Sequence, residues 1–201
     1  EGFKGFAIEF TYCWFATFRR AIREWRGQPF DVIQACNPPD TYWALAVPFK
    51  LLGARFVFDQ HDLNPELFLS RFGEPRSLAG RAQLGGLRWL ERMTYRTADH
   101  VISTNESYAR IARERGHKTA DEVTVVRSGP NTSVMRPVVS EVSHQFDGKH
   151  VLAYLGIMGP QDGVDLVLEV MDLIVHKHGR TDIHAVLMGF GDCLEDLKKQ
   201  C

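Results

Sequence analysis

The sequence predicts an α/β protein with two Rossmann-like, doubly wound parallel sheets. Short apolar runs rich in β-branched residues alternate with helix-length segments over residues 1–135. The same alternation begins again at residue 149, after a polar stretch without clear periodicity. Strands that are separated by helices of this length form βαβ units, in which the strands lie parallel. We therefore expect two domains of the same architecture, joined by a linker at 136–148.

The first domain, residues 1–135, is expected to contain four strands. They are too short for helices and consist mainly of apolar and β-branched residues: DVIQAC (31–36), ARFVFD (54–59), HVIST (100–104) and EVTVV (122–126). Helix-length segments alternate with them at 8–26, 40–52, 77–97 and 105–116. Four parallel strands with these crossovers make up most of one Rossmann-like sheet.

The second domain, residues 149–201, repeats the pattern but stops early. A strand at 150–155 is followed by an amphipathic helix at 163–178, with Asp162 placed as its N-cap. A second strand at 184–188 and the opening of another helix end the chain. Two strands are fewer than a stable sheet normally needs. Since the chain also starts without methionine, we expect a fragment that is truncated at both ends.

Composition argues against several classes of function. The 24 Lys and Arg residues are balanced by 25 Asp and Glu residues. The basic surplus of a nucleic-acid-binding protein is missing, so we expect no nucleic-acid partner. No apolar run approaches the ~20 residues that span a membrane. The four cysteines show no CxxC spacing, which argues against a zinc motif and favours a reducing, cytoplasmic location.

The aromatic segment FTYCWFATF, followed by RRAIREWR, has two interpretations. A basic amphipathic helix lies on anionic lipid, which would put the protein at the inner face of the cytoplasmic membrane. A packed helix with a solvated basic end is the more common structure. Both interpretations stay open at this point, and peripheral membrane contact is kept as a partner hypothesis.

Polar segments follow two neighbouring strands of the first domain. CNPPD (36–40) and DQHDLNPE (59–66) lie at strand ends, where open α/β sheets bind their ligands. Asn37 and Asp62 are candidates for ligand contact, although such residues also cap helices and shape turns. His61 is the strongest candidate, because a histidine at a strand end can bind or transfer a proton.

A metal site is the alternative for the second segment. Asp59 and His61 match the D-x-H opening of a dimetal phosphoesterase. Such a site needs further Asp, Asn and His ligands at later strand ends. The chain has no asparagine–histidine pair, so we expect neither a metal nor another cofactor.

Two glycine turns in the second domain point to a phosphate-bearing ligand. GIMGPQDG (156–163) and GFGD (189–192) both follow strands and open helices, where backbone N–H groups can approach an anion. Neither completes a dinucleotide or P-loop fingerprint, and glycine turns are also common for structural reasons alone. Arg127, in RSGPN after the last strand of the first domain, is a candidate phosphate contact or a solvated edge residue.

The chain resembles glycosyltransferase family 4 over about residues 9–200. The resemblance is carried by six segments in order: DVIQACNPPD, ARFVFDQHDLNPELF, TNESY, VTVVRSGPN, YLGIMGPQDGVDLVL and VLMGFGDCLEDL. Members are retaining, nucleotide-sugar-dependent enzymes of the two-domain GT-B fold. The resemblance implies transfer of a hexosyl or related group to a glycan or lipid-linked acceptor in polysaccharide or glycoconjugate biosynthesis.

The resemblance also implies roles for particular residues. Residues 1–135 correspond to the acceptor-side domain, and His61 to a histidine near the sugar-transfer centre. Residues 149–201 correspond to the start of the donor-side domain. The loop that begins at Gly156 and includes Met158 would lie against the donor diphosphate, and the turn at Gly189 and Gly191 near the nucleotide. Such a fragment is expected to be inactive by itself.

One departure from the family pattern concerns the diphosphate. Many members carry an arginine and a lysine where this chain has Ile157 and Asp162. Either Arg127 substitutes for them, or backbone N–H groups and the helix dipole bind the diphosphate. The loss of both cations also motivates an alternative, a non-catalytic nucleotide-sugar-binding or scaffold protein of the same fold. An NAD-dependent oxidoreductase is disfavoured, because neither glycine turn completes the dinucleotide fingerprint.

Overall fold

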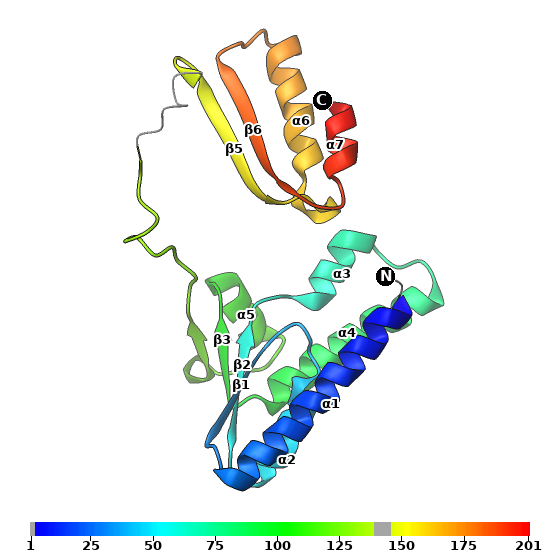
Figure 1. The fold of residues 1–201 in the computed structure, drawn as a ribbon. Helices are drawn as coiled ribbons and strands as arrows, with labels where there is room; N and C mark the ends of the chain where they lie inside the picture. The colour runs from blue at the N-terminus through cyan, green and yellow to red at the C-terminus, as the bar shows by residue number, and fades with distance from the viewer. Residues whose placement is uncertain (1–2, 139–145) are drawn as a thin grey trace. The chain divides into compact units, whose positions relative to one another are not determined.

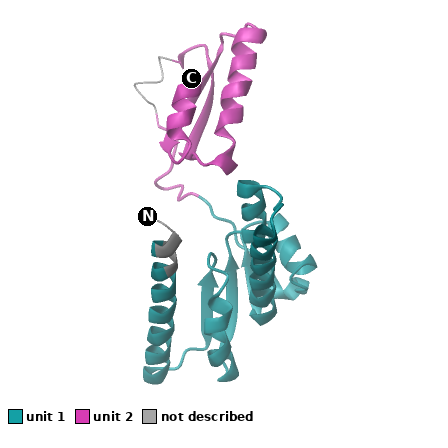
Figure 2. Cartoon of the chain, turned by 90° about the vertical axis from the view of Figure 1, so that its right-hand side faces the viewer, with its two compact units in different colours: residues 1–129 teal, residues 130–201 magenta. Residues whose placement is uncertain are grey.

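The computed structural model describes residues 3–138 and 146–201, which form two compact units (Figures 1 and 2). Unit 1 comprises residues 1–129 and unit 2 residues 130–201. Each contains a parallel sheet with helices against it, so the predicted α/β fold class is confirmed. The predicted linker lies mostly at 139–145, outside the described residues.

The sheet of unit 1 has four parallel strands in the order β1-β2-β3-β4. They are β1 (Val32–Cys36), β2 (Arg55–Gln60), β3 (His100–Ser103) and β4 (Val123–Val125). In the register of the sheet, Cys36 lies opposite Asp59, and Asp59 lies opposite Ile102. The expected strands therefore all form, with their ends within one residue of the prediction.

Five helices accompany this sheet: α1 (Phe3–Gly27), α2 (Tyr42–Leu51), α3 (Asn64–Phe72), α4 (Leu78–Thr97) and α5 (Glu106–Glu114). A short 3₁₀ turn, Ala120–Glu122, precedes β4. Helix α3 was not predicted, since the segment at 59–66 was interpreted as a loop. Its start carries two local signals, Pro65 in the first turn and Glu66 beside the positive end of the helix dipole.

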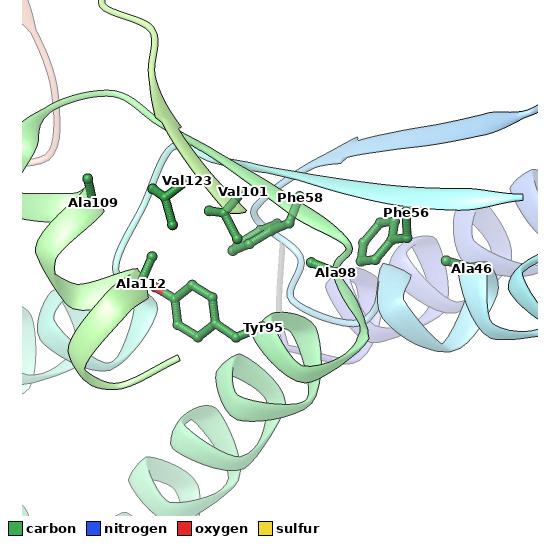
Figure 3. Packing of buried hydrophobic residues seen from close by; sticks show 9 residues of the cluster. All are labelled: Ala46, Phe56, Phe58, Tyr95, Ala98, Val101, Ala109, Ala112 and Val123. Carbon is green, nitrogen blue, oxygen red and sulfur yellow. The ribbon is translucent and has the colours of Figure 1, made fainter. Parts of the chain in front are cut away.

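The core of unit 1 lies on one face of the sheet. Right-handed crossovers between strands in sequential order bring the connecting helices to the same face. Figure 3 shows the resulting cluster, which consists of Ala46, Phe56, Phe58, Tyr95, Ala98, Val101, Ala109, Ala112 and Val123. The Tyr95 hydroxyl accepts a hydrogen bond from Gln60 Nε2 at 2.7 Å, so these two buried polar groups are paired.

Helix α1 packs against α2 with one aromatic face. Trp14, Phe18 and Trp25 contact a cluster around the buried Phe49. Part of its surface stays exposed and carries Ile8, Tyr12, Phe15, Arg19, Arg20 and Arg23. In the part of the chain that the structure describes, no helix is both long enough and apolar enough to cross a membrane.

The opposite face of the unit 1 sheet is mixed, with Val32, Val57 and Ile102 beside its polar side chains. It presents Gln34 and Cys36 from β1, Asp59 from β2, His100 from β3 and Thr124 from β4. His100 Nε2 lies 2.9 Å from Thr124 Oγ1. Among the described residues, the buried clusters of unit 1 lie on the other face, so these polar side chains remain partly or fully accessible.

Unit 2 contains two parallel strands, β5 (His150–Ile157) and β6 (Ile183–Phe190), each longer than predicted. A 3₁₀ turn (Pro160–Asp162) leads into α6 (Val164–Asp172), and α7 (Leu194–Gln200) follows β6. The helix predicted at 163–178 forms over nearly this range, and its hydrogen bonding changes from α-type to π-type over Leu173–Lys177. Met158, Val164 and Leu197 form the buried core of the unit.

Candidate functional site

Asn37 joins the two polar segments that follow β1 and β2. Its side chain is 5% exposed. The Asn37 Oδ1 atom accepts hydrogen bonds from the backbone N–H groups of His61 (2.8 Å) and Asp62 (3.2 Å), and its Nδ2 donates to Asp62 O (2.7 Å). The structure thus brings Asn37, His61 and Asp62 together at the carboxyl ends of adjacent strands. Asn37 holds the backbone on which the histidine stands.

The His61 imidazole lies beside a carboxylate. Its Nε2 is 3.2 Å from Asp59 Oδ1, and its side chain is 48% exposed. Asp59 is itself held by Gln34, whose Nε2 donates to Asp59 Oδ2 at 2.8 Å. When Nε2–H donates to Asp59, Nδ1 of a neutral His61 is an acceptor. The arrangement therefore presents an oriented imidazole with one ring nitrogen available to a ligand.

Cys36 completes the surroundings of Asp59. Its thiol lies 3.7 Å from Asp59 Oδ2, across the β1–β2 register pair. Burial raises the pKa of this thiol, and the negative charge of Asp59 raises it further. Prediction from the sequence overlooked Cys36 as part of this group. Its position at a strand end directly before Asn37 was the available signal.

Asp40 lies behind this group and is buried. Its Oδ2 accepts a hydrogen bond from Asn64 Nδ2 at 2.5 Å, which ties the end of the first polar segment to the start of α3. Burial raises the pKa of Asp40, while the hydrogen bond from Asn64 opposes that rise. Helix α2 has Thr41 as its N-cap residue, without a side-chain capping bond. Asp40 therefore positions α3.

A second, partly buried group, which the sequence did not predict, also holds α3. Arg115 contacts Glu66 Oε1 at 2.5 Å and Glu91 Oε2 at 2.7 Å. Glu91 is 5% exposed, and burial raises its pKa to about 7. The three residues come from α3, α4 and the end of α5. Their spacing in the sequence does not predict that they are in contact.

The remaining candidate of unit 1 is Arg127. It follows β4 and is exposed. Within the described residues it makes no hydrogen bond or ion pair, and the structure does not bring it into contact with His61 or Asn37. Its guanidinium is available to a ligand, but its place beside one stays a prediction.

The glycine candidates of unit 2 lie where backbones approach closely. Gly156 is the register partner of Gly189, and a Cβ on Gly189 would lie 1.8 Å from Gly156 O. A Cβ on Gly191 would lie 2.6 Å from Met158 O, at a φ of +147°. The Met158 side chain is 2% exposed and fills the core, and its N–H donates to Phe190 O at 2.7 Å. Packing alone therefore requires glycine at 189 and 191.

The expectation that Asp162 caps the following helix was wrong. Asp162 Oδ2 accepts a hydrogen bond from Gly159 N at 2.8 Å and closes the 3₁₀ turn instead. Gly163 stands at the N-cap of α6 with φ 65° and ψ 29°, a left-handed conformation that turns the chain away from Asp162. Ile157 is 58% exposed. The loop from Gly156 to Gly163 thus carries no cation, and its N–H groups at Met158, Gly159 and Asp162 already donate to acceptors within the protein.

The parallel sheets and the helices against them define a Rossmann-like α/β protein. The family model of the glycosyl transferase 4-like domain matches residues 5–129, nearly the whole of unit 1. The chain belongs to this family.

A solved structure supports the fold. The crystal structure of Anabaena Alr3699/HepE in complex with UDP is similar to this chain with a TM-score of 0.62 and 14% sequence identity. The match covers 91% of this chain and 47% of HepE, so the chain spans about half of that protein's length. A comparison with curated proteins gives no match.

Proposed function

We propose that the protein that carries this chain is a retaining glycosyltransferase. It moves a hexosyl or related group from a nucleotide-sugar donor to a glycan or lipid-linked acceptor in polysaccharide or glycoconjugate biosynthesis. The observation that carries the proposal is the family match over residues 5–129, which includes the oriented His61 at the strand ends. The similar HepE structure is a complex with UDP, which supports a nucleoside diphosphate as the leaving group.

The proposed reaction breaks the bond between the anomeric carbon and the diphosphate oxygen. An acceptor oxygen forms a new bond to that carbon on the same face, its proton is released, and the nucleoside diphosphate leaves. His61 Nδ1 accepts a hydrogen bond from a sugar hydroxyl and positions the anomeric carbon. In unit 2, backbone N–H groups of the Gly156–Gly163 loop are proposed to bind the leaving diphosphate. In unit 1, the exposed Arg127 is proposed as a phosphate contact. No metal or other cofactor is required.

We also propose where the reaction takes place. The proposed use of a nucleotide-sugar donor favours a cytoplasmic location for the protein. The cysteine spacing, which indicates a reducing compartment, favours the same location. The exposed Ile8, Tyr12 and Phe15 of α1, with the arginines that follow them, suit peripheral contact with an anionic membrane face. Such contact would bring a lipid-linked acceptor to the site.

A second candidate is a nucleotide-sugar-binding scaffold without catalysis. It is favoured by one observation, the absence of a cation between Gly156 and Gly163, where Ile157 is exposed and Asp162 bonds to Gly159. A scaffold would bind the donor without turnover. Turnover and donor binding can both be measured on the same protein. Comparing the two measurements distinguishes the enzyme from the scaffold.

The test is acceptor-dependent release of nucleoside diphosphate from a panel of nucleotide sugars, with donor binding measured in parallel. The assay uses the full-length protein that contains these 201 residues. In that protein we expect His61→Ala to lower kcat roughly a hundredfold with little change in KM. NMR of the product would report the retained anomeric configuration. The 201-residue chain alone is expected to give no turnover.

The matched control is His176→Ala, since His176 is also an exposed histidine beside an aspartate. This variant should keep full activity. A stable His61→Ala protein with unchanged kcat would remove His61 from the reaction. Donor binding by the unaltered protein without any turnover would favour the scaffold.

A further inference from the structure

Three side chains with different donor atoms converge on the open face of the unit 1 sheet. Cys36 and Asp59 are direct register partners on adjacent parallel strands. His61 follows Asp59 by two residues, directly after the end of β2, and its Nε2 lies 3.2 Å from Asp59 Oδ1. Their sulfur, oxygen and nitrogen atoms all lie within 4.8 Å of one another. The register of the sheet brings Cys36 to Asp59, and the bond from His61 N–H to Asn37 holds the backbone that carries the imidazole.

The donor set has a chemical preference. A thiolate, an imidazole and a carboxylate suit zinc and related transition metals, whereas magnesium and calcium prefer oxygen ligands alone. Three protein ligands leave a fourth tetrahedral position for water. Gln34 bonds to the second oxygen of Asp59, which is how outer partners orient a ligating carboxylate. Cys36 and His61 are exposed, so an ion can reach them from solvent.

We propose that Cys36, Asp59 and His61 form a three-ligand site for a zinc-like divalent metal, and that its occupancy inhibits the protein. On binding, the Cys36 thiol releases its proton to solvent and a metal–sulfur bond forms. His61 Nε2 gives up its proton to solvent and exchanges its contact with Asp59 for coordination to the metal. Nδ1 takes up a proton from solvent, so it can no longer accept a hydrogen bond from the sugar hydroxyl. The inhibition rests on the proposed function, which gives His61 the contact with the sugar, whereas the binding of the metal does not depend on it.

Cobalt provides a direct readout of the site. Titration of the reduced protein with Co²⁺ alone should give thiolate-to-metal charge-transfer absorption in the near ultraviolet, and Zn²⁺ should displace it. Cys36→Ser should abolish this absorption, and Gln34→Ala should weaken metal affinity about tenfold. Cys13→Ser is the matched control, because Cys13 is also an exposed free cysteine, and should keep the absorption.

A second measurement needs no variant. Zn²⁺ should protect Cys36 from alkylation, read by peptide mass spectrometry, while the exposed Cys13 and Cys201 of the same molecules react as before. Absence of both the cobalt band and the protection, or a band that persists in Cys36→Ser, would overturn the site.

The inhibitory half of the proposal has its own test. Zn²⁺ should inhibit turnover of the unaltered protein, reversibly on addition of a chelator, and should act much more weakly on Cys36→Ser. If the cobalt band is present while turnover is insensitive to Zn²⁺, the metal site stands and the inhibition is wrong. If the protein turns over no nucleotide sugar, the proposed function fails, and the cobalt titration still decides on the metal site.

Discussion

The strand ends of the two units are built in different ways. In unit 1, side chains connect them: Asn37 bonds to the backbone at 61–62, and Gln34 holds the carboxylate beside His61. In unit 2, backbones meet directly, with Gly189 against Gly156 and Gly191 against Met158. A side-chain network can lose one member and keep the fold, whereas a backbone contact has no room for even one carbon. Substitutions should therefore alter function in unit 1 and folding in unit 2.

The two sheets also differ on the face opposite their buried core. That of unit 1 carries polar side chains, including the Cys36, Asp59 and His61 group. The face of unit 2 away from α6 and α7 is apolar and exposed, with Val151, Leu155, Ile157, Met188 and Phe190. Parallel strands that are apolar on both faces are typical of sheets covered on both sides. The polar side chains on this face of unit 1 are therefore unusual for a parallel sheet.

The largest effect is expected for Gly189→Ala. The added Cβ would lie 1.8 Å from Gly156 O, so β5 and β6 would have to separate. We expect a loss of about 3 kcal/mol or more from the stability of unit 2. Hydrogen exchange of the β5 and β6 amides measures the stability of unit 2 alone. A single melting temperature would not, because the chain has two units. Protection equal to that of the unaltered protein would refute the close-contact explanation.

Asn37→Ala should have the next largest effect. It removes three hydrogen bonds to the loop and leaves partly buried backbone groups without a partner, at a cost of about 2 kcal/mol. The fold should survive, but kcat should fall because His61 loses its support. Denaturant unfolding and turnover measure both quantities. Asn131→Ala removes an exposed side chain that accepts only two local hydrogen bonds from Ser133, so it should cost less, about 0.5 kcal/mol.

The pH dependence of stability should distinguish the units. Burial raises the pKa of Glu91 from 4.5 to about 7. The folded protein therefore keeps a proton that the unfolded chain has already released, so the stability of unit 1 falls as the pH rises from about 4.5 to about 7. After allowance for screening, the change is on the order of 1 kcal/mol. Hydrogen exchange across this range should show it in unit 1, and Glu91→Gln should flatten it. An equal slope in the variant would contradict the assignment.

The smallest effect, of opposite sign, is expected for Gly85→Ala in α4. This glycine is exposed within a helix, and an added Cβ would meet nothing within 4 Å. Alanine loses less backbone entropy in a helix, so unit 1 should gain about 0.5–1 kcal/mol. Thermal unfolding of the variant measures the gain. A loss of stability would show that α4 has less free space at this position than the structure gives it.

Local patterns were sufficient where one segment decides its own structure. Alternating apolar runs predicted the strands and most helices, and the polar segments predicted that Asn37, His61 and Asp62 lie at strand ends. Local reasoning failed at Asp162, because the left-handed Gly163 turns the chain and leaves the aspartate to close the preceding turn. It also missed α3, whose helix-start signals stand inside a segment that was interpreted as a ligand loop.

The sequence by itself determined the order of strands and helices, the parallel sheets and the family resemblance, because each depends on spacing along the chain. Only the tertiary structure decided which side chains touch. Cys36 meets Asp59 because parallel pairing sets two distant residues in register, and Arg115 reaches Glu66 and Glu91 because three helices converge. Such contacts arise from the packing of separate elements against one core. No periodicity within a single element encodes them.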